Sequence, residues 1–475
     1  MLSHIIRREI QGNITSPKFV FTFLLCTILI LVSVYTGASN YRADLKEYGL
    51  AVTLSRKALE MQPSWLAIQN MKTTVPKPPT VLSAVAVGIQ DAVGRNITLD
   101  YTRNPKPIDS KYDSNPVFAI FGPLDLTLIV KIVLSLFAIL FTFDAIAGEK
   151  ERGTLKLALS NSVPRDQLIL GKAIGGFVSL ILPLAIPFLM GLILLNIFPD
   201  VLLTAGDWIR LGIILLCFLL YLSAFFNLGL FISSRTHRSA SSLFILLFIW
   251  VVFIFIIPKA ATMVSRQLVS VPSAHALDSE RQVFSKNVQA KASHVRDAWF
   301  KENPYPSGGP ASAVAEWWSQ LRAFLKQQSE SYYELTGDRF AELDSGYQAR
   351  HRRQQALALN LSRFSPASAM VLSVLNLAKT GTVEHERFLD SMKTYQTAFG
   401  KWVEEKAIEE MQGQRKKRSR EPEPPTLDGM PVHTFDPQSL GGTFSGILLD
   451  VCIMVLVNIV LFVGAYVSFL KYDVR

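Results

Sequence analysis

The chain has 475 residues, of which 49% are hydrophobic and only 18% are charged, whereas a soluble protein of this size carries about 25% charged residues. The net charge of +10 is compatible with a nucleic-acid partner, but the sequence contains no nucleic-acid recognition module. Basic cytoplasmic loops of a membrane protein produce the same excess. The three cysteines lie in apolar blocks without a CxxC or Cys/His cluster, so the sequence indicates neither a metal site nor a disulfide framework.

Six apolar runs are long enough to cross a bilayer as helices. A short basic segment with Ile5, Ile6 and Ile10 precedes the first run and predicts a short interfacial helix. Pro183 and Pro187 lie within the third run and should kink or locally unwind it. The predicted spans, in chain order, are 19–36, 124–143, 170–197, 209–232, 240–257 and 444–470.

Two long polar regions separate these spans. The smaller one has helical periodicity at 41–61 and an alternating pattern at 96–101 that predicts a short strand. The larger one predicts helices at 274–300, 313–336, 338–364 and 384–414. We therefore predict an all-α polytopic membrane protein with six transmembrane helices and a mostly helical domain between spans five and six. The predicted divisions of the chain are 1–37, 38–122, 123–263, 264–440 and 441–475.

The short loops predict the orientation of the chain. The segment after the second span carries five basic residues between Lys150 and Lys172, and the loop after the fourth span carries Arg235 and Arg238. Because Lys and Arg in short loops mark the cytoplasmic side, both termini should be cytoplasmic and both long polar regions should lie outside.

Motifs for enzymatic chemistry are missing from the sequence. It contains no HExxH, no Gly-x-Ser-x-Gly, no P-loop and no GxGxxG. We therefore expect a chain that is not an enzyme and that binds no ATP, metal or other cofactor itself.

Polar residues inside predicted spans are functional candidates. Lys131 in span two and Asp450 in span six should lie at similar depth, which suggests an ion pair across the bundle. The alternative is that Lys131 extends towards the interface while Asp450 faces a water-filled cavity. Asn458 follows Asp450 on the same helical face. Asn196 in span three, Asn227 in span four and the two prolines either line a translocation path or simply pack.

The segment between spans two and three, residues 143–165, is called the elbow here. Gly153 and Thr154 supply a helix start, and Leu155, Ala158, Leu159 and Ser162 share one face at helical spacing. Glu149, Glu151 and Arg152 crowd the junction with the preceding span. A short amphipathic helix between two spans must lie on the membrane surface and offer a face to another molecule, although a charged stop at a membrane surface is the simpler alternative.

This pattern resembles the cytoplasmic loop of type 2 ABC transporter permeases. More narrowly, it resembles the permeases for multi-copper-enzyme maturation (NosY-like), in a variant with large outside regions. The segments 363–369 and 469–475 support that assignment. The residues that match the family's loop pattern are Glu149, Glu151, Gly153, Thr154, Leu155, Pro164, Arg165, Leu170, Gly171 and Lys172.

The resemblance implies a coupling helix at about 150–162 that sits in a groove of a separate ATPase subunit, which would bind ATP and Mg. It also implies a second permease chain, identical or homologous, and a location in the bacterial inner membrane. The residues expected to couple to the ATPase are Glu149, Glu151, Arg152, Gly153, Thr154, Leu155, Leu159, Ser160, Pro164 and Arg165.

Three functions remain open at this stage. The first is export of a substrate across the inner membrane, or its extraction from that membrane. The second is mechanical transmission, in which the outer domain acts on a periplasmic partner and nothing crosses. The third is a receptor or scaffold without an ATPase.

Overall fold

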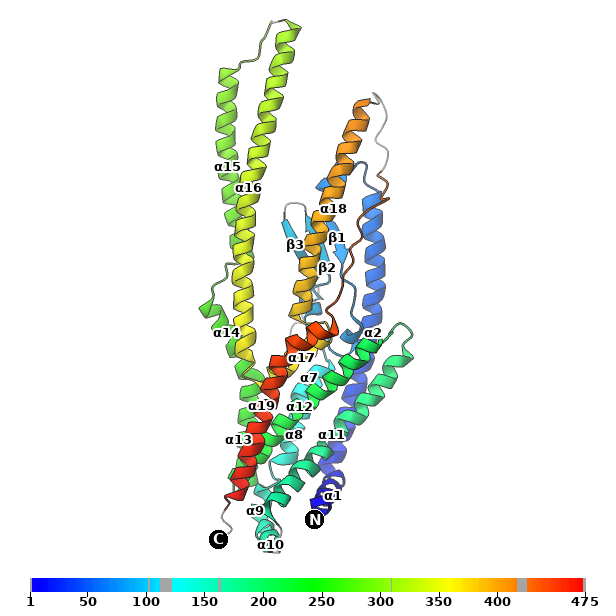
Figure 1. The fold of residues 1–475 in the computed structure, drawn as a ribbon, viewed down its shortest axis with the longest axis vertical. Helices are drawn as coiled ribbons and strands as arrows, with labels where there is room; N and C mark the ends of the chain where they lie inside the picture. The colour runs from blue at the N-terminus through cyan, green and yellow to red at the C-terminus, as the bar shows by residue number, and fades with distance from the viewer. Residues whose placement is uncertain are drawn as a thin grey trace. The chain divides into compact units, whose positions relative to one another are not determined.

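The computed structural model describes residues 2–100, 103–111, 122–160, 164–308, 310–416 and 425–472. The chain forms two compact units, one of residues 1–259 with 362–475 and one of residues 260–361. Figure 1 shows the helices that dominate both units. The elements of each unit are described separately below.

Six helices in the described residues are long and apolar enough to cross a membrane. Each overlaps one predicted span, which confirms an all-α polytopic membrane protein. Two of the six contain a π-helical turn: η2 (Ile129–Leu134) in the second and η3 (Val252–Ile256) in the fifth. The six spans are Pro17–Glu60, Leu126–Arg152, Arg165–Ile197, Ala205–Arg235, Ser239–Leu268 and Leu440–Leu470.

The first span belongs to a longer helix than predicted, because α2 runs without a break over Pro17–Glu60. The Ser16 side chain caps its start by accepting a hydrogen bond from the amide of Phe19 at 3.2 Å. Gly37 does not break the helix but lets it approach the chain at Ala84, whose carbonyl oxygen would lie 2.0 Å from an added Cβ. The helix predicted at 41–61 is therefore the continuation of the first span.

Helix α12 (Ala205–Arg235) lies at the centre of the larger unit. It packs against α8 (Ser135–Thr142), α17 (Pro366–Leu377) and α19 (Leu440–Leu470). Helix α11 (Arg165–Ile197) packs against α2 and against α1 (Leu2–Ile14), the short N-terminal helix that the sequence predicted. Helix α11 continues through Pro183 and Pro187, so the predicted local unwinding is not found.

The smaller polar region contains a three-stranded antiparallel sheet in the order β1-β2-β3. Strand β2 (Asn96–Asp100) confirms the predicted strand over these residues, while Tyr101 lies outside the described residues. Strand β1 contacts α2, and β3 contacts α18, so the sheet joins two helices that are far apart in the sequence (Figure 1). The remaining elements are α3 (Trp65–Asn70), β1 (Thr73–Pro76), η1 (Val81–Ala84), α4 (Gln90–Val93) and β3 (Arg103–Ile108).

The larger polar region differs from its prediction in two ways. Helix α16 (Ala311–Ser362) is continuous over 52 residues, so the predicted break near Gly337 is wrong. A single glycine costs a helix only about 1 kcal/mol, which is too little to end it. Helix α17 (12 residues, beginning at Pro366 after the N-cap Ser365) was not among the predicted helices. The other helices of this region are α15 (Ala274–Glu302) and α18 (Thr382–Lys416), while α13 (Ser239–Val251) and α14 (Ile257–Leu268) form the fifth span with η3.

Candidate functional site

The elbow contains two short helices rather than one. Helix α9 (Ala147–Arg152) ends at Gly153, whose φ of 75° is the left-handed conformation that glycine adopts easily, and α10 (Thr154–Ser160) follows. Within α10, Leu155 is fully buried, whereas Leu157 is 67% exposed. One face of α10 therefore packs into the bundle, and the other face is exposed. Residues 161–163, including Ser162, lie outside the described residues, as do the side chains of Ala158 and Leu159.

The start of α9 is fixed to the end of α12. The Ser233 hydroxyl accepts hydrogen bonds from the amides of Ile146 and Ala147 at 3.1 and 2.9 Å. It also donates to the carbonyl oxygen of Phe143 at 3.0 Å. One side chain therefore satisfies backbone groups on both sides of the turn between span two and the elbow.

Neighbouring charged residues of α9 bind backbone groups at the ends of spans. Glu151 Oε2 accepts hydrogen bonds from the amide and the hydroxyl of Ser239, at 3.0 and 2.8 Å, at the start of α13. Lys150 Nζ donates to the carbonyl oxygens of Ser234 and Thr236 at the end of α12 and lies 4.5 Å from the centre of the Tyr472 ring. Carboxylates suit helix N-termini and cations suit C-termini, so both contacts have the favourable sign.

A buried lysine connects the elbow to the N-terminal helix. Lys172 of α11 is 5% exposed, and its Nζ lies 2.8 Å from Glu149 Oε1 and 3.7 Å from Glu9 Oε2. Next to it, Gly171 and Gly175 allow α1 to approach α11, because an added Cβ would lie 2.4 Å from Ile5 Cγ2 or 2.7 Å from Glu9 Cβ. Helices α1, α9 and α11 therefore meet at one charged centre.

The other end of the elbow is attached to the last span. Arg165 Nη1 donates to the carbonyl oxygens of Leu470, the last residue of α19, and of Tyr472 just beyond it, at 2.8 and 3.0 Å. Pro164 directly precedes α11 as its N-cap, and its carbonyl oxygen accepts the first helical hydrogen bond from the amide of Leu168 at 3.1 Å. The start of α1 and the end of α19 lie at the same end of the larger unit as α9 and α10 (Figure 1).

The predicted elbow residues thus fall into two groups. Glu149, Glu151, Leu155 and Arg165 contact other parts of the bundle, whereas Arg152, Thr154 and Ser160 are exposed together with Lys156 and Leu157. The sequence analysis missed Lys150, Leu157, Ser233 and Ser239. Leu157 lies two residues from the buried Leu155, which places it on the opposite face of a helix and makes it recognisable from spacing alone. The two serines bind through contacts distant in sequence, for which the sequence holds no signal.

Two of the predicted polar residues in the spans bind each other. Asn227 Nδ2 donates to Asn458 Oδ1 at 3.0 Å, and Asn458 Nδ2 donates to the carbonyl oxygen of Leu220 at 2.9 Å. These hydrogen bonds join α12 to α19. The two amides therefore connect the central span to the last one.

The predicted ion pair between Lys131 and Asp450 is wrong. Asp450 is fully buried and its Oδ1 lies 2.6 Å from Arg363 Nε, with Arg363 Nη2 at 3.4 Å from Oδ2. The chain leaving α16 brings Arg363 to the depth of Asp450, and the guanidinium fork fits a carboxylate better than an ammonium does. Lys131 lies in the π-helical turn η2, where its carbonyl oxygen accepts from Tyr221 at 2.7 Å, and it makes no ion pair with a described residue.

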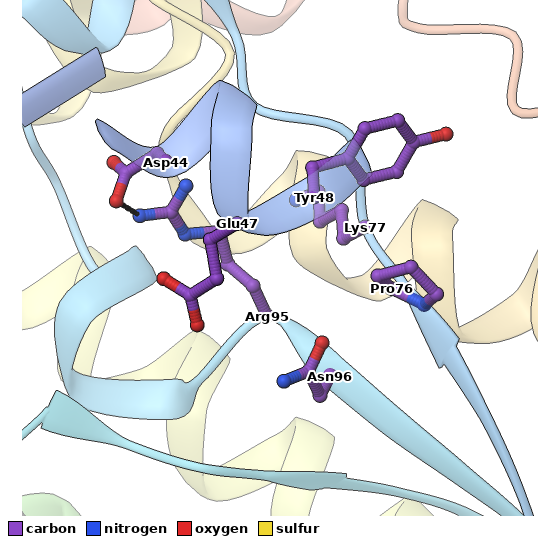
Figure 2. Close-up of a pocket in the computed structure, with 7 residues that line it drawn as sticks. All are labelled: Asp44, Glu47, Tyr48, Pro76, Lys77, Arg95 and Asn96. Atoms are coloured by element: carbon purple, nitrogen blue, oxygen red, sulfur yellow. Dashed lines mark ion pairs between the residues drawn. The ribbon is translucent and has the colours of Figure 1, made fainter. Parts of the chain in front are cut away.

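A small pocket lies between α2 and the sheet of the larger unit. Figure 2 shows Asp44, Glu47 and Tyr48 of α2 beside Lys77, Arg95 and their neighbours, with Asp44 and Arg95 forming an ion pair. Both signs of charge are present, so the pocket has no preference for an anion or a cation. Within the described residues, no group of three metal-ligating side chains is found.

Lys77 continues from this pocket into a buried cluster against α18. Its Nζ lies 5.3 Å from the centre of the Phe388 ring, and burial lowers the pKa of Lys77 to about 8, opposed by the nearby Glu384 carboxylate. Burial, with a contribution from Lys77, also lowers the pKa of His385 to about 4. Lys77 thus interacts with aromatic rings and with the nearby Glu384 carboxylate, without a direct ion pair among the described residues.

A bundle of six apolar spans with a charged elbow fixed to four of them is the architecture of a membrane permease. The chain belongs to the ABC-2 family transporter proteins, whose family model matches residues 3–474. Over 141 residues, or 28% of the chain, it is 33% identical to a probable ABC transporter permease protein NosY of Pseudomonas aeruginosa. The match spans about half, 49%, of that relative. The predicted family is therefore confirmed.

Proposed function

We propose that this chain is the permease subunit of an ABC transporter in the bacterial inner membrane, working with a separate ATPase subunit that binds ATP and Mg. Two permease chains, identical or homologous, would pair above two ATPases. The elbow and both termini would face the cytoplasm, and the chain itself would hydrolyse nothing. The family membership supports the ATPase partner.

The observation that carries the proposal is the division of α10 into a buried and an exposed face. Leu155 anchors the helix in the bundle core, while Leu157 and Lys156 are exposed beside Arg152. Single exposed apolar residues are common, but this one lies on a helix fixed at both ends to membrane spans. A displacement of α10 by a docked ATPase would act on α12 and α13 through Ser233 and Glu151, and on α19 through Arg165.

The transporter would export a substrate across the inner membrane or extract it from that membrane. The second candidate is mechanical transmission to a periplasmic partner through the residues between α14 and α17. One observation favours that candidate: Asn227, for which a path or simple packing was left open, and Asp450, for which a cavity was the alternative, are both bonded to protein groups. Substrate-dependent ATPase activity in proteoliposomes that contain no other protein would support export and speak against transmission.

The docking proposal is tested by co-purification of the ATPase with the full-length chain in detergent. Leu157→Asp should reduce the recovered ATPase at least about tenfold, since a charge replaces an apolar contact at the centre of the interface. Leu202→Asp is the matched control, because Leu202 is 76% exposed and lies between α11 and α12, at the opposite end of α11 from the elbow. Equal recovery with both variants would contradict α10 as the docking helix, and recovery of no ATPase by the wild-type chain would favour a scaffold.

A further inference from the structure

The smaller unit contains a helical hairpin whose tip is rich in aromatic residues. Helices α15 and α16 form its two arms, and residues 303–310 connect them (Figure 1). Three of the seven tryptophans in the chain lie within about 20 residues of one another here. The rings of the tip are Trp299, Phe300, Tyr305, Trp317, Trp318 and Phe324.

Trp317 holds these rings in a fixed arrangement. Its ring centre lies 5.1 Å from Tyr305 and 5.1 Å from Trp318, both nearly perpendicular to it. Its indole Nε1 donates to the carbonyl oxygen of Asn303 at 2.9 Å. Trp299 stacks on Phe324 at 5.0 Å behind this group. The tip is therefore ordered by its own contacts before any partner binds.

Three of the rings are nevertheless about half exposed. Phe300 from the end of α15 is 41% exposed, Tyr305 from the connection is 51% exposed, and Trp318 from the start of α16 is 47% exposed. They come from three consecutive segments and are all joined through Trp317. Together they form a continuous aromatic surface, called the aromatic tip here, which is uncommon on a protein surface unless something binds it.

The rest of the hairpin is held by polar contacts and needs no such cluster. Among the described side chains of α15 and α16, Leu321 is the only buried apolar one. Arg281 pairs with Asp344, and Gln328 Nε2 donates to the carbonyl oxygen of Ala292 at 2.6 Å. Contact between the two arms accounts for Trp299, Trp317 and Phe324, whereas Phe300, Tyr305 and Trp318 pack on Trp317 and still leave about half of their surface exposed.

The charges beside the aromatic tip indicate the kind of partner. Lys301, Glu302 and Glu316 are all exposed next to the rings, so the border carries both signs of charge. An anionic lipid surface selects basic residues around its aromatic anchors. A protein interface instead combines an aromatic centre with a polar rim of mixed charge, and rigid rings lose little entropy on binding.

We propose that the aromatic tip is the docking surface for a folded protein partner. That partner would present an apolar pocket for Trp318 and Tyr305, bordered by polar groups of both signs. The proposal concerns the hairpin alone and does not depend on α10 or on the identity of the ATPase.

The test uses the full-length chain in native membranes with a photo-crosslinking amino acid, p-benzoyl-phenylalanine, in place of the exposed Ser307. We expect one adduct of defined mass, larger than the chain by the mass of a second, different protein. The double variant Tyr305→Ala/Trp318→Ala should lower its yield roughly tenfold or more, as expected for loss of two central aromatic contacts. The matched double variant Val283→Ala/Leu335→Ala should leave the yield unchanged, although these residues are 59% and 57% exposed on the same two helices.

Several results would overturn the proposal. They are an adduct with the mass of two copies of this chain, adducts with lipid alone, a yield equally affected by both double variants, and no adduct at all. Misfolding is excluded with Tyr305→Phe/Trp318→Phe, which keeps the rings and should retain most of the yield, and with circular dichroism of each purified variant. Because the Leu157→Asp variant leaves the hairpin intact, its adduct should persist even when ATPase recovery is lost.

Discussion

The carboxylate of Asp450, buried in α19, is bound by the guanidinium of Arg363, the first residue after α16, with 2.6 Å between Oδ1 and Nε. Three residues further on, α17 begins, and the Ser365 hydroxyl donates to the carbonyl oxygen of Phe253 in the fifth span. The chain that returns from the larger polar region is thus anchored on two spans at once. This contact gives the first prediction.

Arg363→Met should destabilise the protein by about 3–5 kcal/mol, because it leaves the Asp450 carboxylate buried and unpaired. The double variant Arg363→Met/Asp450→Leu should recover most of that loss, since it removes both charges. The free energy of unfolding is measured by SDS titration of the detergent-solubilised protein with circular dichroism. Lys131→Met is the control and should change stability by less than about 1 kcal/mol. A loss with Lys131→Met as large as with Arg363→Met would restore the pairing that the structure contradicts.

The close approach of α1 to α11 gives the second prediction. Gly171→Ala and Gly175→Ala should each detach or displace α1, because the added Cβ would lie under 3.0 Å from Ile5 or Glu9. Gly212→Ala in α12 is the matched control, since nothing lies within 4 Å of its added Cβ. Protease cleavage within residues 2–14 should accelerate in the first two variants alone. Unchanged cleavage in both variants would mean that α1 stays packed on α11 and would contradict the close approach at these glycines.

Substitutions of Leu155 and Leu157 in α10 should distinguish effects on stability from effects on docking. Leu155→Ala should cost about 2–5 kcal/mol of stability, because its side chain is fully buried in the bundle core. Leu157→Ala should change stability by less than about 0.5 kcal/mol, since the side chain is 67% exposed. Both should weaken ATPase association under the proposed function. Unfolding titrations and ATPase co-purification on the same preparations give the two readouts, and a Leu157→Ala variant that unfolds easily would contradict the placement of α10.

The buried cluster at α18 predicts how stability depends on pH. The pKa of His385 falls from 6.5 in the unfolded chain to about 4, through burial and the nearby Lys77. The unfolded chain therefore binds more protons between these values, and stability should drop as pH falls from 6.5 to 4 and then level off. His385→Gln should flatten this acid limb, measured as the unfolding midpoint at each pH.

Lys77 titrates in the alkaline range, where stability should again rise with pH. Burial lowers its pKa from 10.5 to about 8 against the opposing effect of Glu384, so its contribution to stability should rise with pH between 8 and 10.5. Lys77→Met should remove this rise while leaving the acid limb largely in place. An alkaline limb that persists unchanged in Lys77→Met would assign it to another group.

The spans and their order could be predicted because a membrane helix is defined by the length and polarity of one contiguous stretch. The strand at 96–100 and the helices α15 and α18 were equally local signals. The continuity of α2 and α16 was missed, because the first span was predicted to end at residue 36 and separate helices were predicted at 313–336 and 338–364. In α2, Gly37 packs against the chain at Ala84. In α16, the single glycine Gly337 costs too little free energy to end the helix.

The elbow was recognisable as a site, but its internal connections were not. The acidic residues and the Gly-Thr-Leu step are visible in the sequence, and the resemblance assigns them to coupling. That Glu151 caps α13 and that Arg165 caps α19 depends on loops more than 80 and 300 residues away. The wrong partner was predicted for Asp450 for the same reason. The depth of Lys131 in the membrane can be counted along its span, whereas Arg363 comes from a polar region, where such counting does not apply.

The uninterrupted course of α16 has a mechanical consequence. A continuous helix of 52 residues is about 78 Å long and has no joint between its aromatic end and the residue next to Arg363. If its base tilted by about 10°, its far end would sweep through about 14 Å by the geometry of a rigid rod of that length. A displacement too small to open a passage between packed helices would thus become a long stroke at a distance, which makes this helix a lever.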